Sequence, residues 1–214
     1  MPQSIPLSQQ AYEQLRHKIV TLELPPGSVI DEGALQEELG VGRTPIREAL
    51  KRLSLENLVT IVPRRGMFVT EIGINDLQRL LEVRLVLESL AVRLAAQRGT
   101  AEHWQQLQNL VANPSGNHES AVLIQEDEEF HKIIYDAADN HYLHDALVVL
   151  LRLNERLWYY FLVKTNGFQR TAEDHRAIAE KLQAGDGSGA EALMIDHITR
   201  MQKLLQKLIV GESG

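Results

Sequence analysis

Four residues of the types that ligate metal ions lie in the C-terminal part of the chain. Asp127 and His131 are four positions apart, so on a helix they project from one face about one turn apart. His175 and His197 fall in two later helical segments. In a closed helical bundle these side chains can converge, and three imidazoles with one carboxylate suit Zn²⁺, Ni²⁺ or Fe²⁺. The alternative is that His175 caps or packs against a helix and His131 is a hydrogen-bonded core histidine.

Two arginines of the same region are candidates for binding an organic anion. A guanidinium binds a carboxylate through two parallel hydrogen bonds, which makes Arg84 a candidate carboxylate clamp. Glu88 lies one turn further along, so an ion pair within the helix is the competing interpretation of Arg84. Arg156, beside Trp158 and Tyr159, is a second candidate, and a surface position is its alternative.

A basic cluster lies near the N-terminus, although the whole chain of 214 residues carries a net charge of −7. Residues 43–66 hold six basic and two acidic side chains. A basic patch on an acidic protein directs a polyanion to that patch. On a helix Arg43, Arg47 and Lys51 share one exposed face, where arginine can pair with guanine O6 and N7. The apolar side chains form a separate, buried stripe: Ile46, Ala49, Leu50 and Leu53.

Helix signals place this basic face in a helix-turn-helix. The patterns predict helices over residues 8–22, 32–39 and 44–57. Asp31 is a candidate N-cap of the second helix, and Thr44 followed by Pro45 is a candidate start of the third. The glycine-containing turn at residues 40–42 separates these two helices, as a helix-turn-helix requires.

Two β-rich runs follow the third helix. Residues 59–62 and 67–70 flank the sequence Pro63-Arg64-Arg65-Gly66, which predicts a hairpin. Its tip offers two cations and a glycine that permits close backbone approach to phosphates or to the minor groove.

The nonapeptide Gly42-Arg43-Thr44-Pro45-Ile46-Arg47-Glu48-Ala49-Leu50 resembles the recognition-helix signature of the GntR transcription regulators. The hairpin tip followed by Val69 resembles their wing. The resemblance implies that Arg43, Thr44 and Arg47 contact DNA and that the wing reaches into the minor groove. Gly42 departs from the family, which usually has serine at this position. The missing hydroxyl is expected to weaken a phosphate contact or the cap of the helix. The full expected DNA-binding set is Arg43, Thr44, Pro45, Arg47, Lys51, Arg64, Arg65 and Gly66.

Beyond residue 73 no segment has a strand pattern. Six helices are predicted, over residues 75–97, 101–112, 119–138, 142–164, 172–184 and 189–210. The expected fold is therefore mainly α: a winged helix-turn-helix of three helices plus a β-hairpin wing in residues 1–72, and an antiparallel all-α bundle in residues 73–214.

The helical region is similar to the FCD ligand-binding domain of the FadR branch of GntR regulators, in its six-helix VanR-like form. Four stretches carry the similarity: Arg84 with Glu88, Asp127-x-x-Phe130-His131, Asp174-His175-Arg176-Ala177-Ile178, and His197. The resemblance implies a divalent metal on Asp127, His131, His175 and His197, with an organic acid bound beside it. Arg84 and Arg156 are the expected effector-binding residues.

We therefore expect a cytoplasmic, ligand-responsive regulator that binds palindromic double-stranded DNA as a homodimer. No signal peptide or membrane-spanning segment is expected, and without cysteine there is no disulfide. Two alternatives remain open: a metalloenzyme that uses the same four ligands, and a constitutive DNA-binding protein whose histidines are structural.

Overall fold

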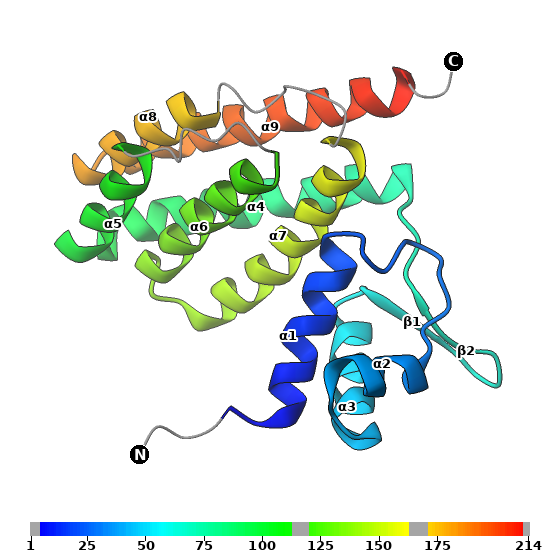
Figure 1. Ribbon diagram of the computed structural model, residues 1–214. Coiled ribbons are helices and arrows are strands. Elements are labelled where there is room, and N and C mark those ends of the chain that lie inside the picture. The colour runs from blue at the N-terminus through cyan, green and yellow to red at the C-terminus, as the bar shows by residue number, and fades with distance from the viewer. Residues whose placement is uncertain (1–4, 113–119, 163–170, 212–214) are drawn as a thin grey trace. The chain divides into compact units, whose positions relative to one another are not determined.

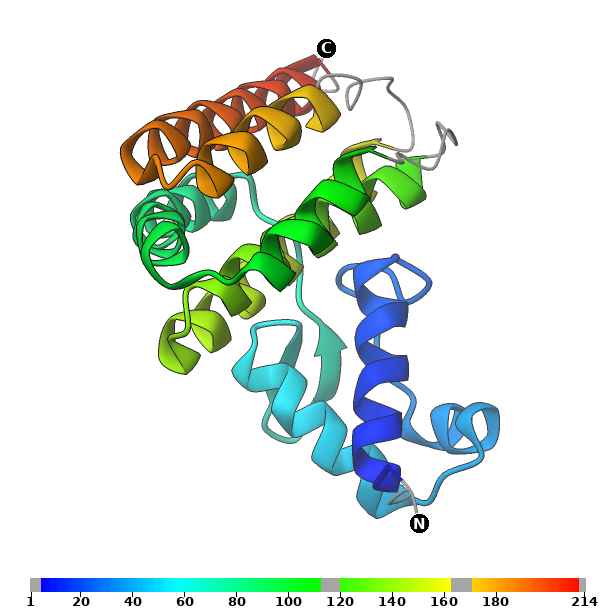
Figure 2. The same ribbon diagram turned by 90° about the vertical axis from the view of Figure 1, so that its left-hand side faces the viewer.

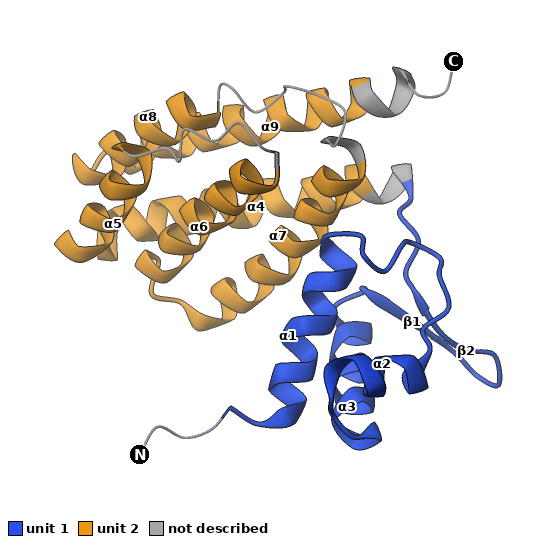
Figure 3. Ribbon diagram, in the orientation of Figure 1, with its two compact units in different colours: residues 1–73 blue, residues 74–214 orange. Residues whose placement is uncertain are grey.

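A computed structural model describes residues 5–112, 120–162 and 171–211. The chain divides into two compact units, unit 1 at residues 1–73 and unit 2 at residues 74–214 (Figure 3). The described residues are mainly helical, with one two-stranded hairpin in unit 1, which confirms the predicted fold class. Within these described residues, no helix is both long and apolar enough to cross a bilayer.

Unit 1 consists of three helices and a hairpin (Figure 1). Its helices are α1 (Leu7–Val20), α2 (Glu32–Leu39) and α3 (Arg43–Leu55). Asp31 is the N-cap of α2, as predicted, because its carboxylate accepts the backbone N–H groups of Gly33 and Ala34 at 2.8 and 3.1 Å. Gly40 ends α2 with φ 63°, a left-handed conformation that favours glycine and turns the chain toward α3.

The start of α3 differs from the prediction that Thr44 is its N-cap. The helix begins at Arg43, and Gly42 takes the N-cap position with an extended backbone. The Gly42 carbonyl accepts the N–H of Ile46, which is the first bond of the helix, and no side chain caps this end. Pro45 is tolerated because the N–H groups of the first turn need no partner within the helix.

The apolar stripe of α3 is the core of unit 1. Ile46, Ala49, Leu50 and Leu53 are fully buried, and α3 packs along α1. Leu15 and Ile19 of α1 are equally inaccessible to solvent. The helical periodicity of the sequence therefore separates a buried face of α3 from the face that carries its cations.

The hairpin pairs β1 (Val59–Val62) with β2 (Gly66–Val69) in antiparallel register, with Val59 opposite Val69. β2 begins one residue before the predicted run, because Gly66 pairs with Val62. The turn places Arg64 at φ 64° and Gly66 at φ 111°. A side chain at Gly66 would be strained by this backbone, so the glycine is required by conformation.

Unit 2 consists of six helices within its described residues, as predicted. They are α4 (Ile74–Arg98), α5 (Ala101–Ala112), α6 (Ser120–Ala137), α7 (His141–Leu162), α8 (Thr171–Gln183) and α9 (Gly187–Gly211). The long helix α9 lies along both α4 and α8, and α6 packs on α4 and α7 (Figures 1 and 2). The predicted breaks at residues 113–116 and 165–167, and helix positions 119, 163 and 164, fall outside the described residues.

Two leucines of α3 provide a matched test of this core. Leu50 is 0% exposed and Leu55 is 84% exposed. Leu50→Ala is expected to lower the free energy of unfolding by about 2–5 kcal/mol, because it removes buried methyl groups and leaves a cavity. Leu55→Ala should change it by less than about 0.5 kcal/mol. Denaturant unfolding of both variants measures the difference, and equal losses would contradict the assignment of the buried face.

Candidate metal centre and nucleic-acid interface

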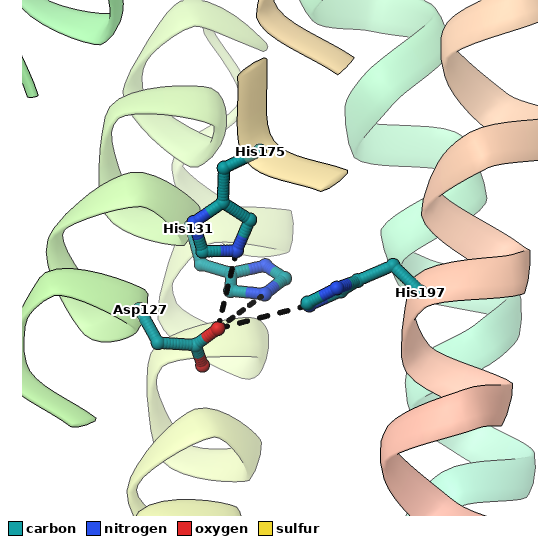
Figure 4. A group of neighbouring side chains, drawn as sticks. All are labelled: Asp127, His131, His175 and His197. Carbon is teal, nitrogen blue, oxygen red and sulfur yellow. Dashed lines mark ion pairs between the residues drawn. The ribbon is translucent and has the colours of Figure 1, made fainter. Parts of the chain in front are cut away.

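Three helices of unit 2 bring the four candidate metal ligands together. Asp127 and His131 come from α6, His175 from the first turns of α8, and His197 from the middle of α9 (Figure 4). All four are buried, and one ligand atom of each lies within 4.8 Å of the others. The Nε2 atoms of His175, His197 and His131 lie 3.2, 3.7 and 4.0 Å from Asp127 Oδ1.

Three inward-facing atoms of this cluster form no hydrogen bond within the described residues. Asp127 Oδ1, His131 Nε2 and His175 Nε2 are inaccessible to solvent and accept or donate no hydrogen bond within the described part of the chain. Burying polar atoms without partners is costly, so such atoms call for an explanation. A cation held between them would satisfy all three at once.

The outward-facing nitrogens of two histidines are bound to carboxylates. His131 Nδ1 lies 3.3 Å from Glu88 Oε2, and His197 Nδ1 lies 3.3 Å from Asp174 Oδ2. A carboxylate at Nδ1 holds the proton there and leaves the Nε2 lone pair free for a metal. His175 is oriented differently, by stacking on Phe130 with ring centroids 3.8 Å apart and an interplanar angle of 4°.

Glu88 and Asp174 are each tied to an arginine and further partners. Glu88 Oε1 accepts hydrogen bonds from the Arg84 guanidinium at 2.7 Å and from the Tyr135 hydroxyl at 2.6 Å. Arg200 donates to Asp174 in the same manner. These contacts hold the carboxylates in place behind the histidines.

Burial and neighbouring charges together set the pKa values in the cluster. Burial alone would raise the pKa of Asp127, but the nearby imidazoles of His175 and His197 outweigh it and hold that pKa well below its usual range. Burial alone would also raise the pKa of Glu88. The nearby His131 and Arg84 outweigh this effect and lower that pKa to about 2. Burial lowers the pKa of His175 to about 4. For His197 burial is outweighed by Asp127 and Asp174, which raise its pKa.

A small pocket lies beside the cluster and is partly open to solvent. Among the described residues its walls are made of Leu81, Arg84, Asp127, His131, Asn154, Trp158, His197, Ile198, Met201 and Gln202. Metal-ligand candidates, an arginine and apolar side chains therefore share one cavity, which is the composition expected of a small-molecule site.

The two candidate effector arginines differ in position. Arg84 forms the ion pair with Glu88 that was its competing interpretation, and it also lines the pocket, so its role as a carboxylate clamp stays a prediction. Arg156 is buried and not on the surface, and burial lowers its pKa to about 10. It is not among the described residues that line the pocket.

The predicted DNA-binding side chains of unit 1 lie on its surface. Arg43 and Arg47 on α3 have side chains 68% and 47% exposed. Thr44 and Lys51 are exposed and Pro45 is half-buried. The turn residues Arg64, Arg65 and Gly66 of the hairpin are exposed as well.

Two features of this surface were not predicted from the sequence. Glu32 of α2 has a carboxylate oxygen 3.4 Å from Arg43 Nε and 4.0 Å from Arg47 Nε, so it holds both arginines near one position. Arg52, which belongs to the basic cluster, lies over the Tyr12 ring at 3.9 Å and donates to Gln9 at 2.6 Å. Its guanidinium is therefore engaged within unit 1.

Glu88 and Glu82 of α4 offer a matched test of the buried ion pair. Glu88 is 0% exposed, whereas Glu82 is exposed and accepts a surface hydrogen bond from Gln78. Glu88→Gln is expected to lower the free energy of unfolding by about 3–5 kcal/mol, because it leaves the buried Arg84 charge uncompensated. Glu82→Gln should have little effect.

The pH dependence gives this test a second readout. The pKa of Glu88 is about 2 in the folded protein against an ordinary value of 4.5, so its stabilising effect is complete above pH 4.5 and is lost as pH falls toward 2. The stability difference between the parent protein and Glu88→Gln should therefore shrink over that range in urea unfolding. A difference independent of pH would show that the stability lost in Glu88→Gln does not come from the ionised form of Glu88.

Comparisons with known proteins cover both units. The FCD domain family matches residues 79–200, and the bacterial regulatory proteins of the gntR family match residues 7–69. The chain is 30% identical over 194 residues to the Nta operon transcriptional regulator of Aminobacter aminovorans, covering 90% of this chain and 91% of that protein. It is 29% identical over 205 residues to the HTH-type transcriptional regulator LutR of Bacillus subtilis (strain 168), covering 86% and 94%.

Solved structures have the same fold. Escherichia coli McbR/YncC matches with a TM-score of 0.85 at 24% sequence identity, covering 95% of this chain and 99% of that one. A putative GntR transcriptional regulator from Rhodococcus sp. RHA1 matches with a TM-score of 0.79 at 18% identity, covering 94% and 97%. The relatives are transcription regulators and not enzymes, which removes the metalloenzyme alternative. The chain belongs to the GntR family of bacterial transcription regulators and carries an FCD domain.

Proposed function

We propose that this regulator acts in the cytoplasm as a homodimer on palindromic operator DNA, and that a divalent metal and a small carboxylic acid in unit 2 control it. The observation that carries the proposal is the buried cluster of Asp127, His131, His175 and His197 beside a pocket. The exposed cations of α3 support the DNA-binding half.

The donor set fits a divalent transition metal. Three imidazole nitrogens and one carboxylate oxygen suit Zn²⁺, Ni²⁺ or Fe²⁺, and three of these atoms lack other partners. When bound, the metal supplies positive charge and open coordination positions for a carboxylate. Glu88 and Asp174 keep His131 and His197 in the orientation and tautomer that such a metal requires.

Unit 1 supplies the DNA-binding elements of the proposal. α3 enters the major groove, where Arg43 and Arg47 contact base edges and Thr44, Pro45 and Lys51 lie against the backbone. The β1–β2 turn, with Arg64, Arg65 and Gly66, contacts phosphates or the minor groove. One helix reads only a half-site, so a two-fold dimer on a palindrome provides the affinity that regulation needs.

Effector control follows from a shift between two arrangements of the dimer. A ligand that binds one arrangement better favours that arrangement, and the coupling free energy expected for such a system is about 1–3 kcal/mol. The alternative, constitutive DNA binding, requires DNA affinity that neither metal nor acid changes.

Arg47→Ala tests the assignment of α3. Loss of a bidentate base contact is expected to weaken binding to an operator duplex, selected in vitro from random sequence, by about 1–3 kcal/mol. Arg16→Ala is the control, because Arg16 lies on α1 and is paired with Glu13. Fluorescence anisotropy at fixed salt measures both variants, and an equal effect of the two would contradict the assignment.

His197→Ala tests the metal centre. We expect the purified variant to lose its metal in elemental analysis, whereas His144→Ala, which changes a histidine paired with Asp136 and Asp145 outside the cluster, keeps it. Because the pKa of His197 is raised, protons compete with the metal, so Zn²⁺ affinity should fall as pH decreases through this raised pKa. Titration of Zn²⁺ against a chelator measures this trend. Zn²⁺ affinity independent of pH, or unchanged in His197→Ala, would place the metal elsewhere.

A further inference from the structure

We propose that the pocket of unit 2 selects an acid with a single negative charge, a small monocarboxylate, over a dicarboxylate. This inference rests on the proposed function and narrows its effector class. Two observations and one charge count carry it: the pairing of Arg84, the composition of the pocket wall, and the net charge that the ligand cluster would have with a divalent metal.

Arg84 offers the pocket little net charge. Its Nε and one Nη donate to the same carboxylate oxygen of Glu88 at 3.2 and 2.7 Å, and both side chains are buried. With the amide oxygen of Asn154 turned toward it, the other Nη donates to that oxygen at 2.9 Å. All three nitrogens of the guanidinium, Nε and both Nη, thus already donate a hydrogen bond within unit 2. Arg84 and Glu88 cancel in charge, so Arg84 does not balance a second carboxylate.

The ligand cluster leaves room for one anionic charge. Asp127 carries one negative charge, and the three histidines ligate a metal in their neutral form. With a divalent cation the cluster therefore has a net charge of +1. The Asp174 carboxylate behind His197 shares Arg200 with the exposed Asp196, so neither Asp174 nor Arg200 supplies positive charge for a second ligand carboxylate. One ligand carboxylate brings the site to neutrality, whereas a second carboxylate gives it an uncompensated negative charge.

The rest of the pocket wall does not provide for that second charge. Among the described residues that line the pocket, the charged side chains are Arg84 and Asp127, besides the two histidines. Leu81, Trp158, Ile198 and Met201 present apolar surface. An ionised group on such a surface loses hydration without gaining a partner, which costs free energy. A methyl or short alkyl group gains from the same contact.

Matched acids test the inference on the full-length protein loaded with Zn²⁺. Butyrate and succinate both have four carbons, and succinate has a carboxylate where butyrate has its terminal methyl group. Malate likewise has a carboxymethyl group where lactate has a methyl group. Isothermal titration should show the monocarboxylate of each pair binding at least about tenfold more tightly, given the strength of charge interactions in a partly buried site. Equal affinity, or tighter binding of the dicarboxylate, overturns the inference.

A variant with one added charge tests the same charge count. Gln202 on α9 lines the pocket and is partly exposed, so Gln202→Lys places a cation there. We expect succinate to gain about tenfold relative to butyrate in this variant. Gln206→Lys is the control, because Gln206 is exposed one turn further along and is not among the described lining residues. An unchanged preference in Gln202→Lys overturns the inference, and the series on the parent protein decides it if that variant does not fold.

The outcomes separate this inference from the proposed function. If the protein prefers the dicarboxylate and its metal content is normal, the inferred preference for a monocarboxylate is wrong and the proposed function stands. Binding of neither acid class overturns both the inference and the effector half of the proposed function. Elemental analysis of the same samples reports independently on the metal centre.

Discussion

The structure of unit 2 depends on one constraint, the burial of the Asp127 carboxylate among three imidazoles that come from three helices. A carboxylate removed from water needs compensating partners, and here they come from α6, α8 and α9. Among the described residues, three atoms that face the centre of the cluster lack hydrogen bonds, whereas the outward-facing nitrogens of His131 and His197 have carboxylate partners. This asymmetry is the observation that favours the proposed ligand site over a hydrogen-bonded polar core, in which both ring nitrogens of a histidine have partners.

The same arrangement joins the pocket to the cluster through α4. Arg84 lines the pocket, its partner Glu88 binds His131, and both lie on the helix that begins the second unit at Ile74. Under the proposed function, an effector carboxylate that contacts Arg84 would change the environment of Glu88 and therefore of His131. We propose this contiguous set of contacts as the route by which the effector biases the position of α4. In unit 1, Glu32 holds Arg43 and Arg47 together before any DNA is present.

Periodicity and local motifs predicted most of the fold, because helix faces and turns are encoded by nearby residues. The buried stripe of α3, the Asp31 cap and the hairpin depend on spacings of a few residues. The predicted start of α3 was wrong because glycine has no side chain that could indicate a cap in the sequence. In the structure the backbone of Gly42 nevertheless occupies the N-cap position. Long-range partners such as Asp174 for His197, or Asn154 for Arg84, have no local signal, since they depend on how distant helices pack. Glu88 was visible only as a possible partner of Arg84, and its contact with His131 became evident from the packing of α4 on α6.

X-ray absorption spectroscopy of the metal in the purified, full-length regulator tests the central claim most directly, because it reports the donor atoms around the metal. We expect one metal per chain with three imidazole nitrogens and a carboxylate oxygen in its inner shell, and the imidazole signal should diminish in His175→Ala. A chain that takes up no stoichiometric metal, or a spectrum without imidazole scattering, would contradict the proposed metal centre.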